Sequence, residues 1–187
     1  MPQNYLLFIV VIGMFVLTAF DKFLDKLMIR RLRMSMVLFL MLSVFSSIEI
    51  QLSLSSEPTK WRVLFSALCY TIRPLIMVEV VYIVRKKVSR LIFIPAVFNA
   101  IAAFSAFFSD ISFGFNENNE FYRGPLGFTP YIVSVLYLIY LIVISIKMLS
   151  GSSKQEGIIV LFIALSCVGA ALIAIDGPSE WVDMTSA

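Results

Sequence analysis

The stretch from Trp61 to Val84 decides the fold of this chain, and its sequence is WRVLFSALCYTIRPLIMVEVVYIV. It is about as long and as apolar as a helix that crosses a bilayer, yet it carries Arg73-Pro74 near its middle and Glu79 further on. An ionised side chain at the bilayer centre costs about 3 kcal/mol or more unless a partner or water compensates it. Proline lacks the N–H of a helix interior, so the same turn is expected to be kinked. The sequence therefore predicts a transmembrane helix with a buried cation beside a kink.

The composition places the whole chain in the same class. Hydrophobic residues make up 60% of the 187 residues, charged residues make up 14%, and the mean hydropathy is +0.94. The net charge of +3 comes from short basic runs beside apolar spans, where cations orient helices, so no nucleic-acid partner is expected. Cys69 and Cys167 fall inside predicted spans and give no reason to pair. The chain has no histidine and no catalytic or metal-binding motif, so we expect no enzyme activity, metal or cofactor.

Five further apolar runs extend the prediction to an all-α, polytopic membrane helix bundle in a single domain, residues 1–187. The six predicted spans are about 5–20, 34–54, 61–84, 91–109, 131–149 and 158–175. Between the first two lies the basic segment Asp21–Arg33. It is either a solvated loop that continues the first helix or a basic amphipathic piece on anionic lipid.

Basic residues predict the orientation in the cell membrane. The first, third and fifth connections hold eleven lysines and arginines, and the second and fourth hold three. By the positive-inside rule the basic connections are cytoplasmic and the amino terminus is outside. With six spans the acidic carboxyl tail is also outside, so a cytoplasmic output domain would need a seventh helix, which this sequence lacks.

Two pairs of polar residues within the spans are candidate networks. Depth along the helices, at about 1.5 Å per residue, predicts that Glu49 approaches Arg73 and that Glu79 approaches Asn99. One interpretation is that these groups only hold helices together. The second is a water-accessible external cavity in which Arg73 binds an anionic ligand or responds to the bilayer, and Pro74 is the part that moves. The third is an ion-conduction path.

The external connection carries a further candidate cluster. Its sequence FYRGPLGFTPY, from Phe121 to Tyr131, has turn formers at Gly124, Pro125 and Gly127, and Thr129-Pro130 is suited to begin a helix. The simpler interpretation is a turn with an interfacial aromatic belt. The alternative makes Arg123, Gly124, Pro125 and Tyr131 part of an extracellular sensing surface.

A resemblance follows from two of these patterns. The run ALCYTIRPLI, from Ala67 to Ile76, and the run Phe121–Tyr131 after the asparagine-rich segment resemble the amino-terminal multi-pass sensor region of bacterial diguanylate cyclases that carry a GGDEF output domain. More loosely, they resemble the seven-helix input regions of membrane histidine kinases. The resemblance implies a sensory input module of signal transduction whose cyclase domain lies outside this sequence.

The predicted partners are therefore the lipid bilayer, a small anionic extracellular ligand and a second copy of the chain in a homodimer. A six-helix transporter or channel subunit remains the alternative function, because it would also combine apolar spans with a central arginine. Flux in proteoliposomes would favour that alternative.

Overall fold

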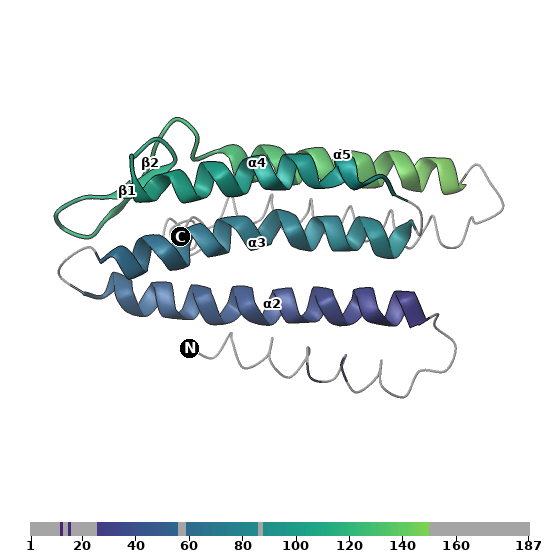
Figure 1. The fold of residues 1–187 in the computed structure, drawn as a ribbon, viewed down its shortest axis with the longest axis horizontal. Helices are drawn as coiled ribbons and strands as arrows, with labels where there is room; N and C mark the ends of the chain where they lie inside the picture. Colours follow the sequence, from purple (N-terminus) through teal and green to yellow (C-terminus); the bar gives the residue numbers. More distant parts are fainter. Residues whose placement is uncertain (1–11, 13–14, 16–25, 56–58, 86–87, 150–187) are drawn as a thin grey trace. The chain divides into compact units, whose positions relative to one another are not determined.

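The computed structural model describes residues 12, 15, 26–55, 59–85 and 88–149 (Figure 1). The chain divides into two compact units, Met1–Val133 and Ser134–Ala187, which we treat separately. The boundary falls within helix α5. All packing described below is between residues of the first unit.

The described residues are mainly helical. The helices are α2 (Lys26–Ser53), α3 (Lys60–Val84), α4 (Phe93–Phe104) and α5 (Thr129–Leu149), and two short 3₁₀ helices, η1 (Arg90–Ile92) and η2 (Ser105–Phe107), flank α4. Four helical stretches are long and apolar enough to cross a membrane: α2, α3, Arg90–Phe107 and α5. The prediction of a helical protein with transmembrane helices is thus confirmed for the spans at 34–54, 61–84, 91–109 and 131–149. The predicted spans at 5–20 and 158–175 lie outside the described residues.

Two predicted connections have a different structure from the one expected. The basic segment before residue 34 is helical from Lys26 onward and forms the first turns of α2, so it is not a loop there. The connection after α4 contains a β-hairpin made of β1 (Phe113–Phe115) and β2 (Phe121–Arg123). The strands are antiparallel, with Phe113 opposite Arg123 and Phe115 opposite Phe121. Alternating aromatic residues in such short strands gave little periodic signal to distinguish them from a loop.

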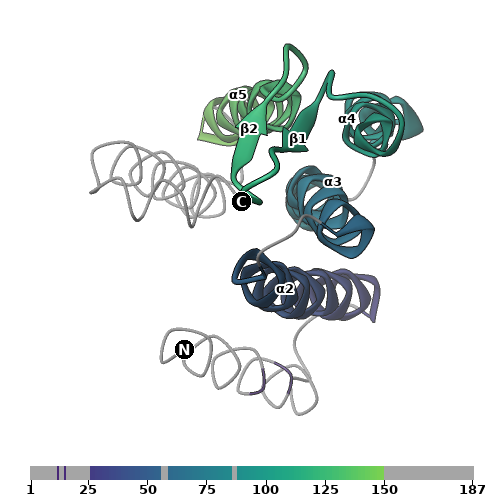
Figure 2. The same ribbon diagram turned by 90° about the vertical axis from the view of Figure 1, so that its left-hand side faces the viewer.

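Helix α3 lies between α2 and α4 in the first unit (Figures 1 and 2). It begins after Thr59, whose hydroxyl accepts a hydrogen bond from the Arg62 N–H and so caps the helix. It runs through Pro74 without a break to Val84. A short connection joins α2 to α3, so the two helices are antiparallel.

The hairpin packs against α3 and α4 through aromatic side chains. The buried core cluster comprises Ala67 and Tyr70 of α3, Ala103 of α4 and Phe113 of β1. The ring centroids of Tyr70 and Phe113 are 5.3 Å apart, and the Phe121 ring stacks on Phe113 at 5.8 Å. Such aromatic contacts add about 1 kcal/mol each beyond their burial, so the hairpin is a packed part of the unit.

Candidate functional site: a buried arginine that joins two helices to the hairpin

Arg62 is placed by the start of α3. The Thr59 cap fixes the first turn of the helix, and the Arg62 side chain is directed into the protein, where only 5% of the residue is exposed. A cation this deeply buried requires compensation, because removing an unpaired charge from water costs several kcal/mol.

Three elements supply that compensation. The Nε–H of Arg62 donates to Oε1 of Glu49 in α2 at 2.9 Å. Its Nη1 donates to Oδ1 of Asn119 at 2.7 Å and also to the Asn119 backbone carbonyl. The guanidinium carbon lies 4.2 Å from the centroid of the Phe115 ring. We call these four residues, Glu49, Arg62, Phe115 and Asn119, the Arg62 junction.

Asn119 connects the hairpin tip to the end of α2. Its side-chain amide N–H groups donate to the carbonyls of Leu52 at 3.1 Å, Ser53 at 3.4 Å and Ser55 at 2.8 Å. The last carbonyls of a helix have no partner within the helix, so Asn119 caps α2 from a distant part of the chain. Its φ is 61°, a left-handed conformation that asparagine tolerates better than most residues.

A second ion pair joins α2 and α3 at their other ends. Nη1 of Arg31 lies 3.1 Å and 3.2 Å from the two carboxylate oxygens of Glu79, and the guanidinium carbon is 4.4 Å from the Tyr82 ring centroid. Arg31 and Glu49 are 18 residues apart on α2, or about 27 Å along the helix. This approaches the ~30 Å thickness of a hydrocarbon core. The two ion pairs are therefore separated along α2 by nearly the thickness of a hydrocarbon core.

Asn99 compensates for the proline in α3. Pro74 has no N–H to donate to the carbonyl of Tyr70 one turn earlier. The side-chain amide of Asn99 in α4 donates to that carbonyl at 2.9 Å, and the Asn99 residue is fully buried. This contact satisfies the backbone group that proline leaves unpaired, and it ties α4 to α3 at the same level.

Two arginines approach Tyr70 from different elements. The guanidinium of Arg73 lies 5.7 Å from the Tyr70 ring centroid, and Arg123 and Tyr131 also lie near the Tyr70 hydroxyl. Nη2 of Arg123 donates to the Tyr131 hydroxyl at 2.9 Å, and the guanidinium faces the rings of Phe128 and Tyr131 at 5.5 Å and 5.1 Å. The Nε of Arg123 is buried and has no hydrogen-bond partner among the described residues.

The turn after β2 is held against the segment before β1. The Gly124 N–H donates to the Ser112 carbonyl at 2.9 Å, and residues 125–128 form a turn that leads into α5 at Thr129, as predicted. A Cβ at Gly124 would overlap the backbone of Asp110 and Ile111, so this position requires glycine. Pro125 is exposed beside it.

The structure gives two of the predicted carboxylates partners that the sequence did not indicate. Glu49, expected beside Arg73, is paired with Arg62, and Glu79, expected beside Asn99, is paired with Arg31. Both predictions started from depth along the helices, and the Arg73 side chain was expected to reach toward Glu49. A basic residue close to a span boundary was counted only as a determinant of orientation, although its long side chain can reach back along the helix to a carboxylate.

The structure also brings together residues that were predicted separately. Arg73 from the apolar span and the Arg123–Tyr131 cluster from the connection both lie around Tyr70. Asn119 and Arg62 were not candidates. The signal that could have indicated Arg62 is that it lies in the first turn of α3, while Glu49 lies about one turn before the end of α2, across the same connection.

The geometry defines a helical membrane protein with four candidate membrane-spanning helices, a buried ion pair between α2 and α3, and a β-hairpin whose Asn119 is bonded to both of these helices. No protein-family model matches the chain, and no curated protein or solved structure matches it. Among the described residues, no group of three or more acidic or cysteine side chains could hold a metal ion.

Proposed function

We propose that this chain is the membrane-embedded sensory input module of a signalling protein, and that the β-hairpin is the part that receives the stimulus. The observation that carries this proposal is the Arg62 junction. One buried guanidinium contacts the hairpin tip at Asn119 and helix α2 at Glu49, and it belongs to helix α3.

This arrangement supports coupling between the hairpin and the helices. Moving Asn119 away would remove two acceptors from Arg62 and the donor that caps α2. Because the guanidinium and carboxylate are buried, the helices would then have to shift or hydrate the pair. A hairpin with two positions would therefore impose two arrangements on α2 and α3, which is what a switch requires.

The proposed stimulus is a small anionic ligand at the hairpin end. Arg123 is the last residue of β2, its Nε lacks a partner among the described residues, and its Nη2 donates to the Tyr131 hydroxyl. The guanidinium of Arg73 lies 5.7 Å from the ring centroid of Tyr70, and that ring packs against Phe113 in the hairpin. An anion that contacts Arg123 would thus act directly on the strand that carries Asn119 to the junction. Arginine is well suited to this role because its planar donors match carboxylate and phosphate groups.

For the output we propose a diguanylate cyclase domain beyond residue 187, on the basis of the sequence resemblance of residues 67–76 and 121–131. The full gene product, expressed in bacterial cells, provides the test through the cellular level of cyclic diguanylate. Asn119→Gly removes the side-chain contacts but keeps a residue that accepts a positive φ. Asn118→Gly is the matched control, because Asn118 is the exposed neighbour in the same turn.

We expect Asn119→Gly to change the cyclic diguanylate level severalfold at equal amounts of membrane protein, and Asn118→Gly to leave it unchanged. Equal levels in both variants would contradict the sensory role of the junction. If the full gene product makes no cyclic diguanylate, the cyclase proposal fails. If proteoliposomes then show flux of ions or small solutes, the transporter or channel alternative replaces it.

A further inference from the structure

Asn99 is enclosed where α4 packs against α3. None of the residue is exposed, and its Nδ2 donates to the Tyr70 carbonyl at 2.9 Å. Its Oδ1 is buried as well, and it accepts no hydrogen bond from any residue that the structure describes. The interface between the two helices therefore contains a side-chain oxygen to which no described group donates.

The side-chain amide of Asn99 cannot be turned over to remove this problem. A backbone carbonyl only accepts hydrogen bonds, so the Tyr70 carbonyl requires the Nδ2 side of the amide. The reversed amide would bring two acceptor oxygens together and leave both without a donor. Oδ1 thus needs a donor of its own, because a buried acceptor without one loses its hydration and gains nothing in return.

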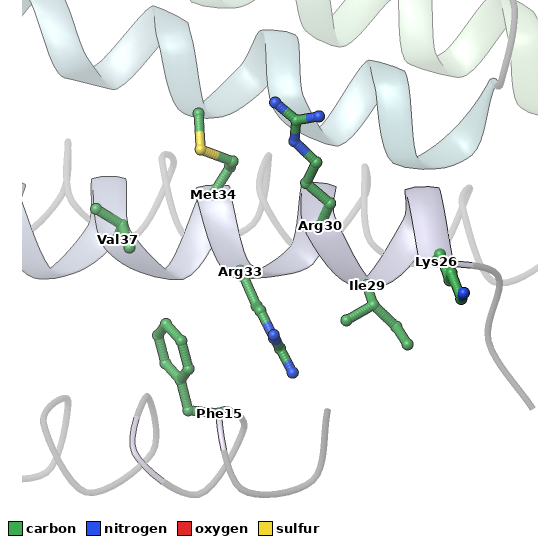
Figure 3. A pocket seen from close by; sticks show the side chains of 7 residues that line it. All are labelled: Phe15, Lys26, Ile29, Arg30, Arg33, Met34 and Val37. Carbon is green, nitrogen blue, oxygen red and sulfur yellow. The ribbon is translucent and has the colours of Figure 1, made fainter. Parts of the chain in front are cut away.

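Exposed polar side chains of the same protein have no such requirement. Lys26, Arg30 and Arg33 line a groove of about 520 Å³ on α2, and all three are exposed (Figure 3). Figure 3 shows Arg30 and Arg33 extending to the two sides of the helix, where water or lipid headgroups can hydrate each of them separately. Asn99 is not exposed, so the donor to its Oδ1 has to be held inside the protein.

We infer that one water molecule is bound to the Asn99 amide inside the α3–α4 interface. The water donates one hydrogen to Oδ1 and accepts the amide N–H on the same edge, while the other N–H stays on the Tyr70 carbonyl. Buried waters are held by about two to four such bonds. The site is one neutral amide enclosed by protein, which suits water better than an ion. It is independent of the sensory role proposed for the hairpin.

The bound water has a consequence for bending of α3. The Asn99 amide replaces the N–H that Pro74 lacks, and Pro74 is the point at which the helix can bend. When the bend changes, the Tyr70 carbonyl moves relative to Nδ2, and the water on the same amide is a second donor beside it. The carbonyl then keeps a hydrogen bond in both positions. The inferred site is thus a hydrated hinge between α3 and α4.

Cross-relaxation between water and the side-chain amide protons of asparagine tests the inference. The purified full chain is isotopically labelled and measured by nuclear magnetic resonance in detergent micelles. Asn119 is the matched control in the same spectrum, because it is also buried but its Oδ1 accepts a hydrogen bond from Arg62. Ser66→Ala and Thr71→Val, made singly and together, remove two hydroxyl groups of α3 whose exchange with water could imitate a bound molecule.

We expect the amide protons of Asn99 to show a water cross-peak at least severalfold stronger than those of Asn119. Its sign should be that of a water held for longer than surface hydration lasts, and it should persist in the hydroxyl variants. Peaks of equal strength at the two asparagines, or no peak at Asn99, would overturn the inference. Loss of the peak in a hydroxyl variant that remains folded would also overturn it, because a side chain of α3 would then be the source.

Discussion

Replacing Arg62 by methionine should strongly destabilise the fold, because it removes the charge and leaves Glu49 buried. Glu49 is 2% exposed, and its described ion pair is with Arg62. Removing one partner of a buried ion pair typically costs about 3–5 kcal/mol, since the other charge stays desolvated. The variant also loses the hydrogen bonds to Asn119. We therefore expect Arg62→Met to lower the free energy of unfolding by about 3 kcal/mol or more.

Arg31→Met is the matched control for this prediction. It removes the same side chain from the second ion pair of the same two helices, but the Arg31 side chain is 30% exposed. Water and screening reduce the value of such a pair, so we expect a loss of about 1 kcal/mol or less. Reversible unfolding in mixed micelles with increasing sodium dodecyl sulfate, followed by circular dichroism, gives both values. Equal losses in the two variants would refute the assignment of the buried junction as the stronger link.

A double-mutant cycle separates the ion pair from the hairpin contact. Glu49→Gln removes the stranded charge, so adding it to Arg62→Met should recover about 2 kcal/mol. The exchange of Glu49→Arg with Arg62→Glu restores opposite charges but places a carboxylate against the Asn119 acceptor oxygens. We expect this exchange to leave the hairpin amides open to hydrogen exchange. Full protection would show that Asn119 does not depend on a donor at position 62.

The other predictions concern three separate contacts. Asn99→Leu should cost about 1–2 kcal/mol of unfolding free energy in the wild type and much less in a Pro74→Ala background, because alanine restores the N–H to the Tyr70 carbonyl. Gly124→Ala should cost about 2 kcal/mol or more, since its Cβ meets backbone that cannot give way easily. The hydrogen bond to Asp110 raises the pKa of Tyr122 above its usual 10.0, so its stabilising contribution should be complete below pH 10 and lost as the pH rises through the raised pKa. Ultraviolet titration of the wild type against Tyr122→Phe measures that pKa.

Each of these three predictions has an outcome that contradicts it. The same cost of Asn99→Leu in both backgrounds would mean that the amide does not replace the proline N–H. Pro125→Ala, a change at an exposed neighbour, is the control for Gly124, and equal losses would argue against a steric cause. An unchanged Tyr122 pKa in Asp110→Asn would remove the carboxylate as the source of the shift.

The sequence predicts the helices well because their signal is local. Apolar runs of about 20 residues identify α2, α3, the Arg90–Phe107 stretch and α5 without any knowledge of their neighbours. Thr129-Pro130 likewise begins α5, since proline is favoured in a first turn. The signal for the start of α2 is less local. Its basic start has the composition of a loop, and the contact of Arg31 with Glu79 of α3 is distant in sequence.

The candidate site is less predictable because its contacts are distant in sequence. Arg62 and Asn119 are 57 residues apart, and no periodic pattern relates a hairpin tip to a helix start. Depth along the helices predicts Glu49 and Glu79 toward opposite ends of the spans, but depth cannot identify which of several cations faces a carboxylate. Asn99 is a buried polar residue, as predicted. Its partner is a backbone carbonyl, which cannot be found by matching side chains alone.

The two ion pairs between α2 and α3 have a consequence for how the protein enters the membrane. Each helix contributes one cation and one carboxylate to these pairs, about 27 Å apart on α2 and about 26 Å apart on α3, so the two charges on one helix cannot pair with each other. Released into lipid alone, α2 would expose Glu49, and α3 would expose Glu79. When the two helices insert together, each of these carboxylates is paired with an arginine of the other helix. This complementarity favours insertion of α2 and α3 as a pair.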